Sequence, residues 1–153
     1  MGKVYIVGAG PGDLAYLTIR AQQILSQAEV LIYDALIDRS LLDLVPSNCI
    51  LVDVGKRGGK PSMLQAEIDL LLVKYAQTGQ TVVRLKSGDP FIFGRVTAEL
   101  DALIAANCEY EVVPGLSTAL VAPLLAGIPL TDPVLSRAFA VITAHFPDDL
   151  DWD

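Results

Sequence analysis

Charged side chains follow two apolar runs in this sequence, at positions where they can do chemistry. Asp34 comes directly after the run 30–33, and Lys56 and Arg57 follow the run 50–54 in the glycine-bearing segment VGKRGGK. Ligands of open α/β sheets bind beside the carboxyl ends of the strands, so both segments are expected on the ligand side. Lys and Arg pair with carboxylates at close range, which suits a substrate that carries many of them. The alternatives are a turn or helix-capping role for Asp34 and a solvated charge cluster for the basic loop.

A glycine-rich turn, VGAGPGD, follows the first apolar run of the chain. Its glycines, Gly8, Gly10 and Gly12, permit a tight turn and let a ligand approach the backbone. The spacing is similar to the dinucleotide-binding pattern GxGxxG but does not match it, because the third glycine comes one place early. Pro11 also removes an amide that could bind phosphate. A nicotinamide site and a plain strand-to-helix turn both remain as alternatives.

The segment VVRLKSGDPFIFGR, residues 82–95, combines the end of an expected strand at Leu85 with a turn and two aromatic side chains. The letters SGDP predict a turn that the proline fixes. Phe91 and Phe93 then lie in a loop, where aromatic side chains of soluble proteins commonly line a pocket or an interface. Arg95 ends the segment. This combination is more specific than a glycine turn alone.

A fifth segment, PGLSTALVAP, begins where another apolar run ends. A helix is expected over residues 116–126, which Pro123 ends or kinks. The small side chains at its start, Thr118 and Ala119, would let a flat cofactor lie against the backbone. Taken alone, the segment could equally be a hinge between two domains.

The elements that must position these segments form an α/β pattern. Apolar runs that predict buried parallel strands alternate with helical patterns of apolar residues. The strands are expected at residues 4–7, 30–33, 50–54, 81–85 and 110–113, and the helices at 14–28 and 64–75. This order predicts an open, mostly parallel sheet flanked by helices.

The composition of the sequence changes after Pro114, where small and apolar residues are interrupted by prolines. We expect an N-terminal α/β domain over residues 1–114 and a linker with the cofactor-binding helix over 115–135. A strand at 139–143 would begin a truncated second α/β domain, 136–153. The first domain should fold alone, whereas the chain beyond about residue 130 should be mobile or self-associate.

Composition excludes several classes of protein. The 153 residues are 52% hydrophobic and carry a net charge of −7, whereas nucleic-acid binders normally present a basic face. No apolar run approaches the roughly 20 residues of a membrane span, and the start has no secretory leader, so we expect a cytoplasmic protein. The single His145 has no ligand-like neighbours, and no metal site is expected.

Taken together, the five segments resemble the tetrapyrrole methylase superfamily, and within it the uroporphyrinogen III C-methyltransferases. The resemblance covers residues 3–152 and implies two α/β domains with S-adenosyl-methionine in the cleft between them. It also implies an acid–base pair, Asp34 and Lys56. The substrate would be held by Arg95, with Arg57 and Arg137 as further basic contacts. The cofactor would contact Pro11, Ser87, Gly88, Asp89, Ile92, Thr118 and Ala119.

Three positions depart from the family pattern. Ser87 replaces a glycine, and Arg95 is followed by VTAE where relatives often have GGEE. The letters TDP at 131–133 replace a basic THR, and Arg137 is the candidate substitute. The departures after Arg95 and at 131–133 concern ring binding, whereas Ser87 lies in the cofactor site and should serve there through backbone contacts.

The implied reaction is methylation of uroporphyrinogen III at two rings, which gives precorrin-2 for siroheme or cobalamin synthesis. We expect a tetrapyrrole as partner, neither nucleic acid nor membrane, and a homodimer in the full-length enzyme. The fragment alone is expected to be inactive. The alternatives are a sister methylase for a later corrin intermediate, a non-catalytic cofactor-binding or assembly module, and a nicotinamide-dependent dehydrogenase.

Overall fold

The computed structural model describes residues 2–55 and 63–143. They contain a sheet whose strands are β1 (Lys3–Gly8), β2 (Val30–Tyr33), β3 (Ile50–Asp53), β4 (Val82–Lys86) and β5 (Glu109–Val113). The helices are α1 (Ile19–Leu25), α2 (Gln65–Gln77), α3 (Val96–Ala105) and α4 (Thr118–Leu125), with short 3-10 turns η1 (Leu14–Tyr16) and η2 (Arg39–Leu44). Each of the five predicted strands of the first domain is present, and the predicted α/β class is confirmed.

The sheet has the strand order β3-β2-β4-β1-β5, and every registered pair is parallel. The chain leaves β1 towards β2 and β3 on one side, whereas β4 connects across β1 to β5 on the other side. The neighbouring strands β1 and β4 therefore connect in opposite directions. Such a switch opens a crevice at the carboxyl ends of the two strands, where ligands of open α/β sheets bind.

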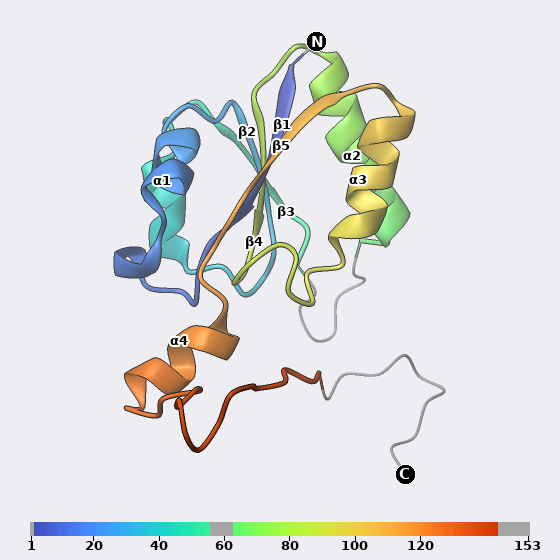
Figure 1. The fold of residues 1–153 in the computed structure, drawn as a ribbon. Coiled ribbons are helices and arrows are strands. Elements are labelled where there is room, and N and C mark those ends of the chain that lie inside the picture. The colour runs from blue at the N-terminus through green and yellow to red at the C-terminus, as the bar shows by residue number, and fades with distance from the viewer. Residues whose placement is uncertain (1, 56–62, 144–153) are drawn as a thin grey trace. The chain divides into compact units, whose positions relative to one another are not determined.

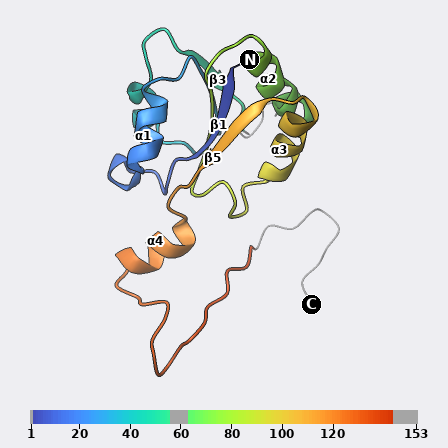
Figure 2. The ribbon, with the colours of Figure 1, turned by 45° about the horizontal axis from the view of Figure 1, so that its top comes forward.

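Helices cover both faces of the sheet, with α1 on one side and α2 and α3 on the other (Figures 1 and 2). Strand alternation sends successive side chains to opposite faces. In β4, Val83 and Leu85 belong to the apolar cluster that includes α1, whereas Val82 belongs to the cluster that includes α2 and α3. Burial on both faces explains why the strands are apolar at consecutive positions.

Local signals set the helix boundaries. The predicted first helix divides into η1 and α1, because Thr18 caps a new helix start through a hydrogen bond from the Ala21 amide to its hydroxyl, 3.1 Å. Helix α2 ends before Gly79, whose φ of 88° is the left-handed conformation expected after a helix. Helix α3 was not predicted, although Val96, Leu100 and Leu103 follow a helical spacing.

The C-terminal part differs from the prediction at one element. The chain divides into compact units, 1–118 and 119–153, and this division falls inside the predicted linker 115–135. The predicted division into three parts stays a prediction. Helix α4 continues past Pro123 to Leu125. Residues 139–143 form no strand, so that prediction is wrong for the structure. Their apolar pattern suits a strand, but a strand also needs a neighbour to pair its backbone.

No helix among residues 2–55 and 63–143 is long and apolar enough to cross a membrane.

Candidate functional site

Glycine-bearing turns after β1 and β4 join at the carboxyl edge of the sheet. The Gly10 amide donates to the Gly88 carbonyl, 3.1 Å, and the Gly88 amide donates back to the Gly10 carbonyl, 2.8 Å. Both residues have positive φ, 72° and 65°, which a glycine adopts without the cost of a Cβ. The turn after β1 and the turn after β4 are therefore one hydrogen-bonded unit at the topological switch point.

The turn after β5 packs against this unit through bare backbone. A Cβ at Gly115 would lie 2.1 Å from the Gly88 carbonyl oxygen, and a Cβ at Gly8 would lie 2.5 Å from the Gly115 Cα. No residue with a side chain fits at these two positions without a shift of the backbone. We call the turns 8–13, 87–90 and 114–117 the glycine platform.

Asp89 holds the platform together. One carboxylate oxygen accepts from the Phe91 amide, 2.9 Å, and the other accepts from the Gly115 amide, 3.1 Å. The carboxylate that the family resemblance assigns to cofactor binding thus already fastens the β4 turn to the β5 turn. In this structure Asp89 positions backbone groups around the site.

The platform leaves room above two of its glycines. A Cβ at Gly12 would meet nothing within 4 Å, and a Cβ at Gly88 would meet only the Ser117 Cα, 4.0 Å away. Pro11 is half-buried, and Ser87 is exposed. A small, flat ligand can approach backbone closely at such a place, so these residues fit the adenosyl group of the cofactor that the resemblance implies.

The aromatic loop after the platform is exposed and tightly turned. Phe91, Ile92 and Phe93 are 62%, 46% and 58% exposed. Phe93 and Arg95 have positive φ, 53° and 50°, which is uncommon for residues other than glycine. Arg95 directly precedes α3, and its side chain is exposed. Side chains of this loop are available to a ligand or to another part of the protein.

Asp34 lies beside a buried arginine. It follows β2 on the face that also carries Val30 and Ile32, and its side chain is 30% exposed. The Arg84 guanidinium of β4 donates to the Asp34 carboxylate at 2.7 Å. Asp34 caps none of the described helices but begins a turn, in which its carbonyl accepts from the Ile37 amide at 3.2 Å. Its carboxylate is in addition ion-paired with Arg84.

A buried charge network continues from Arg84 into α3. Arg84 Nε donates to Glu99 Oε1 at 2.9 Å, and Lys86 Nζ donates to both Glu99 oxygens at 3.0 and 3.1 Å. Glu99 is fully buried, and Arg84 and Lys86 are 2% and 4% exposed. We call Asp34, Arg84, Lys86 and Glu99 the buried charge network.

The spacing of charged residues in β4 and α3 is a sequence signal for this network, although the network was not predicted. In β4, Val82, Arg84 and Lys86 alternate onto one face of the sheet, and in α3 Val96, Glu99 and Leu103 share the buried side. Two cations on the inward face of a strand require a carboxylate nearby, because buried charges are paired. No helix was predicted at residues 96–105, so Glu99 was not recognised as that partner.

The network shifts the pKa values of its two cations in opposite directions. Burial alone would lower the pKa of the Arg84 guanidinium, but the charges of Glu99 and Asp34 outweigh burial and raise it. Burial lowers the pKa of the Lys86 ammonium, and the charge of Arg84 lowers it further against the opposing effect of Glu99. Arg84 therefore stays cationic beside Asp34.

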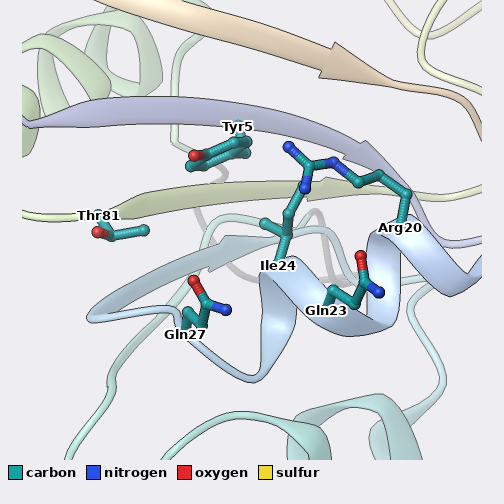
Figure 3. Close-up of a pocket in the computed structure, with 6 residues that line it drawn as sticks. All are labelled: Tyr5, Arg20, Gln23, Ile24, Gln27 and Thr81. Carbon is teal, nitrogen blue, oxygen red and sulfur yellow. The ribbon is translucent and has the colours of Figure 1, made fainter.

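A separate cavity of about 250 Å³ lies against α1 (Figure 3). It is lined by Tyr5, Arg20, Gln23, Ile24, Gln27 and Thr81. Thr81 precedes β4, so the cavity lies towards the amino ends of the strands, away from the glycine platform. The predicted site residues do not line it.

The remaining predicted residues divide into three groups. Lys56, Arg57 and His145 lie outside the described residues. Thr118 and Ala119 begin α4, as the sequence predicts. Arg137 is exposed, and its Nε donates to the Pro133 carbonyl at 3.2 Å in the C-terminal unit. Among the described residues, no group of three or more His, Cys, Asp or Glu side chains could hold a metal ion.

Comparison with known proteins decides the family. The family model for tetrapyrrole (corrin/porphyrin) methylases matches residues 3–153. This chain belongs to the tetrapyrrole methylase family. The family resemblance read from the five sequence segments is thereby confirmed, and a dehydrogenase is excluded as the family.

Named relatives of this tetrapyrrole methylase include a uroporphyrinogen-III C-methyltransferase from Synechococcus elongatus. It is 67% identical over 152 residues, which are 99% of this chain and 63% of the relative. A siroheme synthase from Baumannia cicadellinicola is 49% identical over 99% of this chain and 34% of its own length. The chain thus spans less than two thirds of the length of both relatives.

A solved structure supports the fold of this tetrapyrrole methylase. Uroporphyrin-III C-methyltransferase from Thermus thermophilus, complexed with S-adenosyl homocysteine, superposes with a TM-score of 0.73 at 41% identity. The match covers 90% of this chain and 53% of that protein. The parallel sheet and its flanking helices are therefore those of the first part of the family fold.

Proposed function

We propose that this chain is the first part of an S-adenosyl-methionine-dependent methyltransferase that converts uroporphyrinogen III to precorrin-2. The observation that carries the proposal is the glycine platform at the switch point of the sheet, with Asp34 after the neighbouring β2. The 67% identity to a uroporphyrinogen-III C-methyltransferase supports this substrate over a later corrin intermediate.

The cofactor would lie on the platform. Gly12 and Gly88 have open space where a side chain would otherwise stand, which leaves backbone accessible to the adenosyl group. Pro11, Ser87 and Ile92 border the same turns, and Thr118 and Ala119 begin the helix that follows the third turn. Asp89 would act on the cofactor through the backbone that it holds in place.

S-adenosyl-methionine supplies an electrophilic methyl group when it is bound, so the protein mainly aligns the reacting carbons. Methylation of a pyrrole carbon also releases a proton. Asp34 would accept that proton, since its carboxylate is partly exposed and anchored at one oxygen. Lys56 would assist Asp34, as a proton donor or by binding a carboxylate of the substrate. Arg57, Arg95 and Arg137 would pair with the propionate and acetate groups of the macrocycle.

Isothermal titration with S-adenosyl homocysteine tests the cofactor site. Gly88→Ala places a Cβ in the open space of the platform and should weaken binding at least about tenfold, a cost near 1.4 kcal/mol. Gly79→Ala is the matched control, because Gly79 also has positive φ and open surroundings but ends α2. Equal affinity losses in both variants would refute the placement of the cofactor.

Methyl transfer to uroporphyrinogen III by the full-length protein tests the reaction. Turnover with formation of precorrin-2 is the expected result. Turnover only with a later corrin intermediate would favour the sister methylase, and cofactor binding without turnover on any tetrapyrrole would favour a binding or assembly module. Homodimerisation and a cytoplasmic location stay predictions from the sequence.

A further inference from the structure

We propose that Arg84 is a positioning residue that fixes the Asp34 carboxylate for proton transfer. The inference rests on the proposed function, in which Asp34 accepts the proton. It concerns a residue of the segment 82–95 to which the family resemblance assigns no role. The direct observation is the 2.7 Å ion pair between the Arg84 guanidinium and one Asp34 oxygen.

Every nitrogen of Arg84 is engaged. Nε donates to Glu99 at 2.9 Å, one terminal nitrogen donates to the Leu85 carbonyl at 3.3 Å, and the other donates to Asp34. The side chain is 3% exposed. A guanidinium held at three points in the interior cannot change its orientation without breaking hydrogen bonds. It therefore presents a fixed donor to Asp34.

The geometry leaves one oxygen of Asp34 for the reaction. Arg84 binds Oδ1, and within the part of the chain that the structure describes Oδ2 has no hydrogen-bond donor. The Asp34 side chain is 30% exposed, in contrast to the buried Arg84. One oxygen is thus anchored in the protein interior, and the carboxylate keeps exposed surface for a substrate.

Sheet register explains why Arg84 reaches Asp34. Arg84 is paired with Ile32 of β2, and Asp34 lies two residues further along the same face. The arginine side chain extends from β4 towards the carboxyl edge, where the platform begins. A lysine ammonium at this position cannot hold Asp34 and Glu99 in the same fixed geometry, because only the planar fork of arginine presents a separate donor to each.

A purely structural role would be served by fewer contacts. The Arg84–Glu99 pair would be sufficient to join β4 to α3. Lys86 of the same strand also neutralises the charge of Glu99, through hydrogen bonds to both of its oxygens. Lys86 makes no hydrogen bond to Asp34 within the described residues. Lys86 is therefore a matched control for Arg84: it is a buried cation of the same strand, bound to the same glutamate, but without the bond to Asp34.

The test is a double-mutant cycle on methyl transfer by the full-length protein, with uroporphyrinogen III and S-adenosyl-methionine as substrates. Arg84→Gln should lower kcat by on the order of 10–100-fold, as a small displacement of a catalytic group does. KM and the affinity for S-adenosyl homocysteine should change less than about twofold, because the proposed role of Arg84 is to orient Asp34 and not to bind substrate or cofactor. In the Asp34→Asn background, Arg84→Gln should lower kcat by less than about twofold further.

Lys86→Gln should lower kcat by the same factor whether residue 34 is Asp or Asn. Arg84→Lys keeps the positive charge and should fold, yet it should lower kcat by at least about fivefold, since a lysine lacks the fork. The inference is overturned if Arg84→Gln loses the same factor in both backgrounds, or if Arg84→Lys has normal kcat. If Arg84→Gln does not fold, Arg84→Lys in both backgrounds decides by the same criteria. Failure of the unmodified protein to methylate uroporphyrinogen III would overturn the proposed function as well.

Discussion

Two clusters in this chain each combine one Arg, one Lys and two carboxylates, but their surroundings differ. The buried charge network joins Arg84 and Lys86 to Asp34 and Glu99 at 2.7 to 3.1 Å. A second cluster, which we call the surface cluster, joins Lys3 and Arg20 to Glu109 and Glu111 at 2.8 to 3.3 Å. The distances are nearly equal, so contact geometry alone does not distinguish the two.

Burial distinguishes them. The side chains of Arg84, Lys86 and Glu99 are 3%, 5% and 0% exposed. Those of Lys3, Arg20, Glu109 and Glu111 are 30%, 52%, 71% and 30% exposed. Water screens the surface cluster, and exposed ion pairs contribute little to stability. In the buried network each charge depends on its partners, because the loss of one leaves another desolvated and unpaired.

Position in the fold adds a second difference. The buried network ends at Asp34, at the carboxyl edge of the sheet beside the glycine platform. The surface cluster links α1 and β1 to the outer strand β5, in which Glu109 and Glu111 lie. An Arg, a Lys and two carboxylates therefore serve a candidate active site in one place and a solvated edge in the other.

The largest contrast is expected in turnover. Asp34→Ala in the full-length protein should lower kcat by about 10²–10⁴-fold, the usual loss for a general base. The affinity for S-adenosyl homocysteine should stay within about threefold, a cost of roughly 0.7 kcal/mol. Glu109→Ala, which removes a carboxylate from the surface cluster, is the control and should keep normal turnover. Near-normal turnover of Asp34→Ala would reduce Asp34 to a structural residue.

The next largest contrast concerns stability. Glu99→Ala leaves Arg84 and Lys86 buried without their shared carboxylate, and it should lower the free energy of unfolding by about 3–5 kcal/mol. Glu111→Ala in the surface cluster should change it far less. Urea unfolding followed by circular dichroism measures both. Equal losses would show that burial does not separate the two clusters.

Replacement of Arg84, Lys86 and Glu99 together, with Asp34 kept, separates the effect of the network on stability from its effect on turnover. The triple variant Arg84→Met, Lys86→Leu, Glu99→Leu removes the buried charges together and should be as stable as the original or up to about 4 kcal/mol more stable. Its turnover should still fall, because Asp34 loses its anchor. Urea unfolding and a methyl-transfer assay on the same preparation provide the comparison. A triple variant with full turnover would argue against a role for the network in the reaction.

The smallest effect is a pH dependence in the surface cluster. Hydrogen bonds from Arg20 and Lys3 lower the pKa of Glu111 in the folded state. The stability that Glu111 contributes is therefore present above the unfolded pKa of about 4.3 and is lost as pH falls through the folded value. The difference in stability between the original chain and Glu111→Gln should be largest near neutral pH and vanish in acid. Urea unfolding of both chains at neutral and at acid pH measures this difference, and an equal difference at the two pH values would contradict the prediction.

Local patterns predicted much of the fold and part of the site. Consecutive apolar residues identified the strands, because the inner strands β2 and β4 are covered on both faces and bury nearly all of their side chains. Glycine turns identified the platform, since only glycine allows the close approach between Gly8 and Gly115. The strand predicted at 139–143 does not form, because strand formation depends on a neighbouring backbone that a local pattern cannot supply.

The sequence by itself determined the family, the order of the strands along the chain and the residues of the platform turns. Only the tertiary structure decided that Asp34 is anchored by Arg84, that Asp89 fastens two turns, and that Glu99 closes the network from α3. Each of these contacts joins residues at least 15 positions apart, and two of them join residues 26 and 50 positions apart. Strand order and register set such contacts, and both depend on the packing of the whole sheet rather than on any single segment.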